Sequence, residues 1–97
     1  MSNERVLTAL GFARKAGKAA SGELSAEKAL KSGRAKLCVL DEGVSQNSRE
    51  RWENACKNAG VPLIFAEGVG KAIGREAHTV ACITDTGLAQ MAMSGKN

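Results

Sequence analysis

Aromatic residues are scarce in this chain of 97 residues, which contains two phenylalanines, one tryptophan and no tyrosine. Proteins of the RRM and OB types bind single-stranded nucleic acid by stacking successive bases on several exposed rings. Three rings are too few for that mode of binding. We therefore expect any nucleic acid that binds this chain to be recognised through its shape or backbone, as a folded RNA would be.

Cysteine is also scarce, and the three cysteines, Cys38, Cys56 and Cys82, lie far apart in the sequence. They form no Cys-x-x-Cys pair, and no cysteine has a histidine at the spacing typical of zinc ligands. Because each cysteine lies in an apolar segment, we expect reduced, buried thiols. The sequence thus predicts no metal site and no cofactor.

Long hydrophobic runs are absent as well. The longest aliphatic run covers residues 37–40, whereas a membrane-spanning helix needs about 20 apolar residues. The chain does not begin with a charged and then apolar leader. We expect a cytoplasmic protein with no membrane partner.

The remaining composition is that of an ordinary globular protein, with 43% hydrophobic and 25% charged residues. Such a composition argues against disorder. A length of 97 residues fits one domain of usual size. The sequence therefore predicts a single domain over residues 1–97.

Positive charge is concentrated in the first third of the chain. The formal net charge is +4 and the isoelectric point is about 9.2. Residues 1–36 contain eight cations and three acids, a net charge of +5, whereas the other residues together carry −1. This basic third favours a surface that binds a polyanion. The alternative is a face of solvated lysines without a partner.

Helix and strand signals alternate along the chain. Apolar spacing and glycine stops predict helices over residues 2–16, 22–32, 45–59, 69–73 and 85–94. Strands are expected at residues 37–40, 63–66 and 79–84, and residues 18–21 should be extended. Residues 37–40 are apolar without alternation, which is typical of a strand buried on both faces. The pattern predicts the α/β class: a three-layer α/β/α sandwich with a small mixed sheet of about four strands.

Polar residues mark where these helices should begin. Ser2 or Asn3 is expected to cap the first helix. The third helix begins at Ser45 or Asn47, and Asn47 has the spacing of a capping box with Glu50. Asp85 should cap the last helix, which is expected to end at Gly95.

Three features resemble catalytic or ligand sites only weakly. Gly68-Val69-Gly70 follows a strand and leads into a helix, but it lacks the third glycine of a dinucleotide loop. His78 and Cys82 would share one strand face, although no acid–base partner accompanies them. Asp41 and Glu42 follow a strand, and we expect them in a solvated loop rather than in a metal site.

A stronger candidate is the segment around Ser21-Gly22-Glu23, where a helix N-terminus meets the basic third of the chain. Free backbone N–H groups at a helix N-terminus favour an anion. Lys28 lies about two turns into this helix, and Arg14, Lys15 and Lys18 come from the preceding connection. This arrangement favours binding of a phosphate backbone over an ordinary helix end with surface lysines.

Several motifs in this chain resemble the ribosomal protein L7Ae/L30e family, most closely its short bacterial YlxQ-like members. The matching segments are Phe12-Ala13-Arg14-Lys15-Ala16-Gly17-Lys18, Ser21-Gly22, Lys28-Ala29-Leu30, Gly33-Arg34-Ala35-Lys36-Leu37, Gly60-Val61-Pro62 and Gly70-Lys71-Ala72-Ile73-Gly74. They follow one another in order over nearly the whole chain. The resemblance implies an α/β/α sandwich that binds kink-turn RNA without catalysis, as a cytoplasmic, ribosome-associated protein.

The family motif Gly-x-Asn-Glu-x-x-Lys, which contacts sheared G·A pairs, is only partly present. Gly22 and Lys28 match its glycine and lysine, but Leu24 and Ser25 stand at the asparagine and glutamate positions. Leu24 has no side-chain donor or acceptor for a base edge. A second contact loop, usually apolar in the family, is the polar segment Arg75-Glu76-Ala77-His78 here. The resemblance then implies RNA binding with weakened kink-turn specificity.

The RNA-binding residues that these considerations predict are Arg14, Lys15, Lys18, Gly22, Glu23, Ser25, Lys28, Lys31, Arg34 and Arg75. The expected partner is a structured RNA, either ribosomal or kink-turn-like, and the expected oligomeric state is a monomer. One alternative is a protein-interaction module of the transcription or translation machinery, with Leu24 as a contact. Another is a nucleotide-binding enzyme that uses Gly68-Val69-Gly70.

Overall fold

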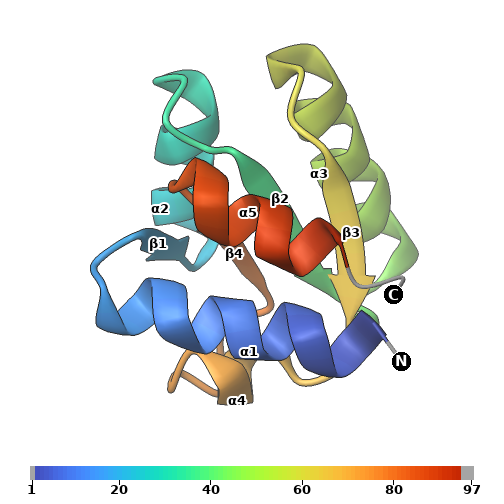
Figure 1. Cartoon of the computed structure of the whole chain (residues 1–97). Coiled ribbons are helices and arrows are strands. Elements are labelled where there is room, and N and C mark those ends of the chain that lie inside the picture. The colour runs from blue at the N-terminus through green and yellow to red at the C-terminus, as the bar shows by residue number, and fades with distance from the viewer. Residues whose placement is uncertain (1, 95–97) are drawn as a thin grey trace.

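The computed structural model describes residues 2–94, with side chains from residue 4 onward (Figure 1). Helices and strands alternate in the order α1 (Ser2–Lys15), β1 (Ala19–Ser21), α2 (Glu23–Lys31), β2 (Leu37–Asp41), α3 (Gln46–Ala59), β3 (Leu63–Ala66), α4 (Val69–Ala72), β4 (Val80–Ile83) and α5 (Thr86–Met93). The expected elements are all present, with ends shifted by one or two residues. Within residues 2–94, no helix has the length and apolar character needed to cross a membrane.

The sheet has four strands in the order β1-β4-β2-β3. β2 and β3 are parallel, whereas β4 runs antiparallel to both of its neighbours, β1 and β2. This confirms the predicted mixed sheet. The order also places β1 beside β4, which follows it in the chain only after three further helices.

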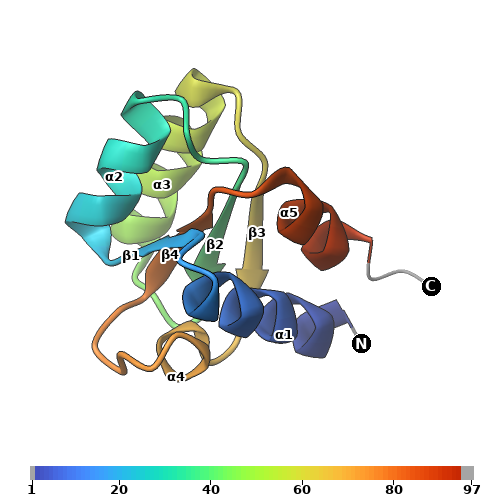
Figure 2. The ribbon, with the colours of Figure 1, turned by 60° about the vertical axis from the view of Figure 1, so that its left-hand side comes forward.

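Helices cover both faces of the sheet, as predicted. α1 and α5 lie side by side on one face, and α2 and α3 cover the other (Figure 2). Alternate side chains of β2 face the two layers: Leu37 and Val39 pack with α1, α4 and α5, whereas Cys38 and Leu40 pack with α2 and α3. All four side chains are fully buried, which explains why this run of the sequence is apolar without alternation.

Two of the expected helix caps are settled by the structure. Ser45 is the cap of α3, because its hydroxyl accepts a hydrogen bond from the Ser48 N–H at 3.2 Å. The predicted capping box is wrong, since Asn47 already lies inside the helix and Glu50 accepts from the Gln46 amide. Asp85 caps α5 as predicted, through the Leu88 N–H at 2.9 Å.

Two expectations at the chain ends concern side chains or residues that the structure does not describe. Capping by Ser2 or Asn3 depends on side chains outside the described residues. Gly95, expected to end the last helix, also lies outside them.

Candidate nucleic-acid interface

The junction between β1 and α2 depends on Gly22. Its φ of 87° and ψ of 161° lie in a region that glycine alone adopts readily. The Gly22 N–H donates to the Val80 carbonyl at 2.9 Å, which ties the junction to β4. Among the residues that the structure describes, no side chain caps the N-terminus of α2. The first N–H groups of that helix are therefore not satisfied by a capping side chain.

The loop between α4 and β4 is held against the start of α4 by Gly70. A Cβ at residue 70 would lie 2.7–2.8 Å from the carbonyl oxygens of Arg75, Glu76 and His78, so no larger residue fits there without movement. The Arg75 N–H donates to the Gly70 carbonyl at 2.8 Å, and the His78 N–H donates to the Arg75 carbonyl at 2.9 Å. These contacts fix the loop that carries Arg75 and His78.

His78 joins this loop to the β1–α2 junction. Its Nδ1 lies 3.1 Å from the Ser21 hydroxyl, within hydrogen-bond distance. The imidazole also lies against Gly22, where a Cβ would be only 3.0–3.3 Å from three ring atoms. Two segments more than 50 residues apart in the sequence are thus brought together by one hydrogen bond and one close contact.

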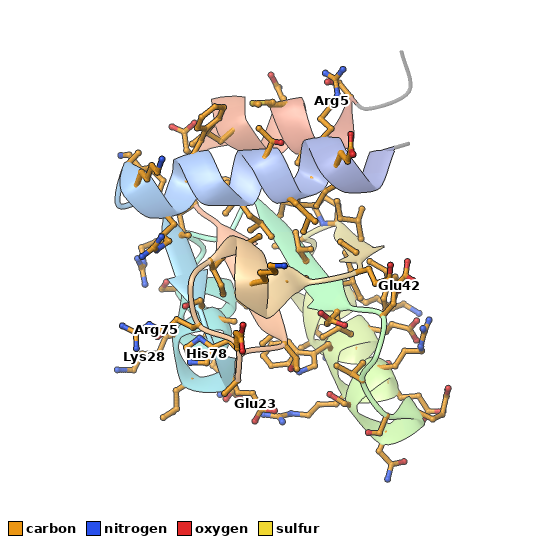
Figure 3. The ribbon with its side chains drawn as sticks, turned by 90° about the horizontal axis from the view of Figure 1, so that it is seen from below. Arg5, Glu23, Lys28, Glu42, Arg75 and His78 are labelled. Carbon is orange, nitrogen blue, oxygen red and sulfur yellow. The ribbon has the colours of Figure 1, made fainter. Side chains whose placement is uncertain are left out.

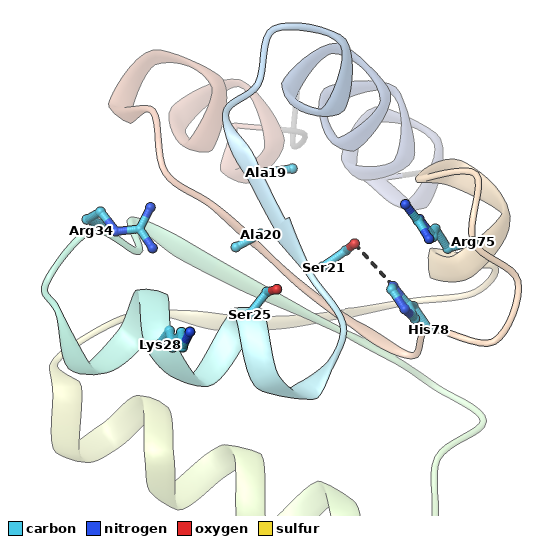
Figure 4. Close-up of a pocket in the computed structure, with 8 residues that line it drawn as sticks. All are labelled: Ala19, Ala20, Ser21, Ser25, Lys28, Arg34, Arg75 and His78. Carbon is cyan, nitrogen blue, oxygen red and sulfur yellow. Dashed lines mark hydrogen bonds between the residues drawn. The ribbon is translucent and has the colours of Figure 1, made fainter.

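An open pocket of about 480 Å³ lies between these segments. Its lining consists of Ala19, Ala20, Ser21, Ser25, Lys28, Arg34, Arg75 and His78 (Figure 4). We call it the junction pocket. It contains three cations, two hydroxyls and an imidazole but no acid, so it is suited to a phosphate or another anion.

Four of the ten predicted residues, Ser25, Lys28, Arg34 and Arg75, line the junction pocket. Figure 3 shows Lys28, Arg75 and His78 together on one side of the molecule, away from Arg5 and Glu42. Gly22 does not line the pocket but holds the junction beside it. Arg34 is oriented by a hydrogen bond from its Nε to the Ser32 hydroxyl at 3.2 Å.

Glu23 and Lys31 belong to a different surface. Arg51 of α3 lies 3.3 Å from the Glu23 carboxylate and 3.9 Å from that of Glu27. Lys31 pairs with Glu27 at 3.4 Å, one turn along α2. The pairing follows helical spacing, because residues four apart share a face. The structure therefore places these two predicted residues in a mixed-charge network between α2 and α3, outside the pocket lining.

The three cations of the first connection also lie outside the pocket lining. Arg14, at the end of α1, lies against Gly74, where a Cβ would be 2.9 Å from the guanidinium carbon. This contact places Arg14 next to the loop that carries Arg75. Lys15 and Lys18 are exposed, and the Lys18 carbonyl accepts from both the N–H and the hydroxyl of Thr84.

His78 and Ser21 are pocket residues that the predicted set does not include. The sequence pattern instead paired His78 with Cys82, and the structure contradicts that pairing. His78 precedes β4 and faces Ser21, whereas Cys82 is fully buried and its Sγ contacts the Ala26 carbonyl at 3.7 Å. Only the pairing of β1 with β4 brings Ser21 near His78. No local pattern in the sequence predicts that pairing.

The three cysteines are free, buried thiols in one core cluster, as expected. Cys38 and Cys82 are direct partners on β2 and β4, and Cys56 approaches from α3. Hydrogen bonds to Cys56 and Cys82, together with burial, raise the pKa of Cys38 well above its usual range. Within residues 2–94, no group of three histidine, cysteine or acidic side chains is arranged to hold a metal ion.

The backbone N–H groups of the glycine turn before α4 already have a hydrogen-bond partner within the chain, the side chain of Asp41. One carboxylate oxygen of Asp41 accepts from the Gly68 N–H at 3.1 Å and the Val69 N–H at 3.0 Å. The other accepts from the Gly43 N–H at 2.9 Å. Asp41 is therefore a half-buried capping residue and not part of a solvated loop. Its carboxylate fills the position that a phosphate would take, which contradicts a nucleotide site at Gly68-Val69-Gly70.

Comparison with known proteins shows where this architecture recurs. The chain matches the ribosomal protein L7Ae/L30e/S12e/Gadd45 family over residues 4–91. It is 35% identical over 97 residues to the RNA-binding protein YlxQ of Bacillus subtilis (strain 168), with 97% of each chain covered.

Two solved structures have the same fold. A protein of unknown function from Bacillus halodurans superposes with a TM-score of 0.84 at 22% identity, covering 93% of this chain and 94% of its own. The 15.5kD RNA binding protein of Giardia lamblia superposes with a TM-score of 0.79 at 20% identity, covering 96% of this chain and 86% of its own. At these identities the likeness supports the fold alone.

Proposed function

Because the chain belongs to the ribosomal protein L7Ae/L30e/S12e/Gadd45 family, we propose that it is a non-catalytic RNA-binding protein whose RNA interface is the junction pocket. Its similarity to a relative named as an RNA-binding protein supports this role. The ligand that we propose is a structured RNA, ribosomal or kink-turn-like, bound by a monomer in the cytoplasm.

The observation that carries the proposal is the charge of the junction pocket. Lys28, Arg34 and Arg75 come from three different parts of the chain and line one open pocket without an acid. Charge-assisted hydrogen bonds from such groups to phosphate oxygens position a nucleic acid without reading its sequence. Affinity should therefore fall steeply with salt, because binding releases counterions from the phosphates.

Base-specific recognition is expected to be weaker than in relatives that have the full Gly-x-Asn-Glu-x-x-Lys motif. Leu24 is 73% exposed at the start of α2 and offers no hydrogen bond to a base edge. Ser25 lines the pocket with a neutral hydroxyl in place of a carboxylate. We infer that the protein keeps backbone contacts to a kink-turn and discriminates less strongly against RNAs that lack sheared G·A pairs.

A titration with three RNAs tests this function. A kink-turn hairpin, the same hairpin with its G·A pairs replaced, and a plain duplex are each titrated at two salt concentrations. We expect binding of all three at low salt, a modest preference for the intact kink-turn, and a steep loss at high salt. Failure to bind any of them at low salt would refute the proposal.

A pair of variants tests the location of the interface. Arg75→Ala removes a pocket cation and should weaken binding of every RNA. Lys57→Ala removes an exposed cation from the last turn of α3, outside the pocket lining, and should leave affinity unchanged. If the two variants lose affinity equally, the junction pocket is not the interface.

Leu24 supports a second candidate function. A leucine that is 73% exposed at the start of a helix can be a contact for another protein. The chain would then be an interaction module of the transcription or translation machinery. Capture of a partner from nuclease-treated lysate, lost in a Leu24→Ser variant, would favour this function over RNA binding.

A further inference from the structure

His78 is the only histidine of the chain, and it lines the junction pocket. Its Nδ1 is engaged by the Ser21 hydroxyl at 3.1 Å. Its ring can lie so close to the β1–α2 junction only because Gly22 has no side chain. Nδ1 is thus the ring nitrogen that is bonded to Ser21 (Figure 4), and Nε2 has no hydrogen-bond partner among the described residues.

The protonation state of this imidazole decides what it offers to a ligand. A neutral imidazole has one donor and one acceptor nitrogen, whereas an imidazolium donates through both. The Ser21 hydroxyl can donate to Nδ1 or accept from it. When His78 is charged, Nδ1–H donates to Ser21 and Nε2–H is free to donate to a phosphate oxygen.

Three cations line the pocket together with His78. Lys28 comes from α2, Arg34 from the turn after it, and Arg75 from the loop of His78 itself. The nearby acids do not line the pocket: Glu23, in the first turn of α2, is paired with Arg51, and Glu76 is exposed in the loop. A bound phosphate would offset part of the positive charge of these three cations and accept a hydrogen bond from the ring.

We propose that His78 takes up a proton when the junction pocket binds an RNA phosphate, so that RNA affinity increases as the pH falls. This inference rests on the proposed function. Linkage requires the two effects to be reciprocal: if RNA favours the protonated ring, protonation must favour RNA to the same extent. Imidazole changes charge between about pH 5 and 8, so the change in affinity should fall in that window.

Affinity measurements across this window test the inference. The dissociation constant of the kink-turn hairpin is measured between pH 5.5 and 8.0 at constant ionic strength. For the unmodified protein we expect roughly tenfold tighter binding at the acidic end, which is the lower end of what one charge-assisted hydrogen bond contributes. His78→Gln keeps a donor of similar reach but does not titrate. The RNA affinity of this variant should therefore vary with pH only as far as groups on the RNA itself titrate.

Two further variants separate this effect from a general response to pH. Lys57→Ala, outside the pocket, should follow the unmodified protein. Ser21→Ala removes the partner of Nδ1 and should reduce the gain at acidic pH. Thermal unfolding shows whether each variant is folded. A His78→Gln variant with the same pH dependence as the unmodified protein would overturn the inference.

Nuclear magnetic resonance provides a readout that does not depend on affinity. Because the chain has one histidine, the ring ¹⁵N signals belong to His78. We expect the midpoint of their titration to move to higher pH when the RNA is added, by about 1 pH unit for a tenfold gain in affinity. An unmoved midpoint with RNA bound overturns the inference but leaves the proposed function intact. Absence of RNA binding at every pH overturns both.

Discussion

The imidazole of His78 lies against the α carbon of Gly22, and a β carbon at residue 22 would be 3.0 Å from the ring. This contact joins the β1–α2 junction to the loop before β4. Gly22→Ala should therefore displace the ring and also strain the backbone, which has a φ of 87°. We expect a loss of roughly 1–3 kcal/mol in the free energy of unfolding and weaker RNA binding. Urea unfolding and RNA titration measure the two effects.

Gly60→Ala is the matched control for that substitution. Gly60 also has a positive φ, of 71°, and it ends α3 away from the pocket. Apart from its chain neighbours, no atom of the described residues lies within 4 Å of the position that a Cβ would take there. The variant should lose stability through backbone strain alone and keep its affinity for RNA. Equal affinity losses in the two variants would show that the contact with His78 is irrelevant to binding.

Two lysines on α2 should differ in their importance for RNA binding. Lys28 lines the junction pocket, whereas Lys31 is paired with Glu27 outside its lining. Lys28→Ala should weaken binding of all RNAs and lower the salt dependence by about one counterion. Lys31→Ala, a change of the same type three residues away, should have a smaller effect. Fluorescence anisotropy at several salt concentrations measures both; a larger effect of Lys31→Ala would contradict this placement.

Kink-turn discrimination should increase when the missing motif residues are introduced. Leu24 and Ser25 stand where the family motif has asparagine and glutamate. The double variant Leu24→Asn, Ser25→Glu supplies an amide and a carboxylate that can hydrogen-bond to base edges. We expect its preference for the intact kink-turn over the G·A-replaced RNA to rise about tenfold. An unchanged ratio of the two dissociation constants would mean that these positions do not face the G·A pairs.

Asp41 should contribute to stability and not to binding. Its two carboxylate oxygens accept from the backbone N–H groups of Gly43, Gly68 and Val69. Asp41→Asn replaces one acceptor oxygen with an NH₂ group, so at least one of these N–H groups loses its partner. We expect a loss of about 1–2 kcal/mol in the free energy of unfolding. Glu42→Gln, at the exposed neighbouring position, should have no such effect in the same denaturation experiment.

Stability should decrease at alkaline pH because of Cys38. Its raised pKa keeps the thiol protonated in the folded protein, whereas an unfolded thiol ionises near pH ~8.5. Above that pH the unfolded state holds fewer protons than the folded state, so the free energy of unfolding falls as the pH rises. Urea unfolding between pH 7.5 and 10 measures this slope. It should be shallower in Cys38→Ala; an identical slope would contradict the assignment to Cys38.

Local signals in the sequence were sufficient for the elements and their layers. The run at residues 37–40 indicates a strand buried on both faces, and β2 is such a strand, because its side chains alternate between two helical layers. Asp85 predicted the start of α5, since a cap acts within one turn of the chain. At α3 the same reasoning allowed either Ser45 or Asn47 as the N-cap residue, and the structure shows that the cap is Ser45.

The amino-acid sequence by itself thus determined the α/β/α architecture, the basic first third and the cations from which a binding surface could be made. Only the tertiary structure decided which of those residues share a pocket. The pairing of β1 with β4 brings Ser21 to His78, and ion pairs with Arg51 and Glu27 hold Glu23 and Lys31 on another surface. The physical reason is range: helix caps and apolar periodicity act over a few residues, whereas the pocket depends on contacts between segments more than 50 residues apart.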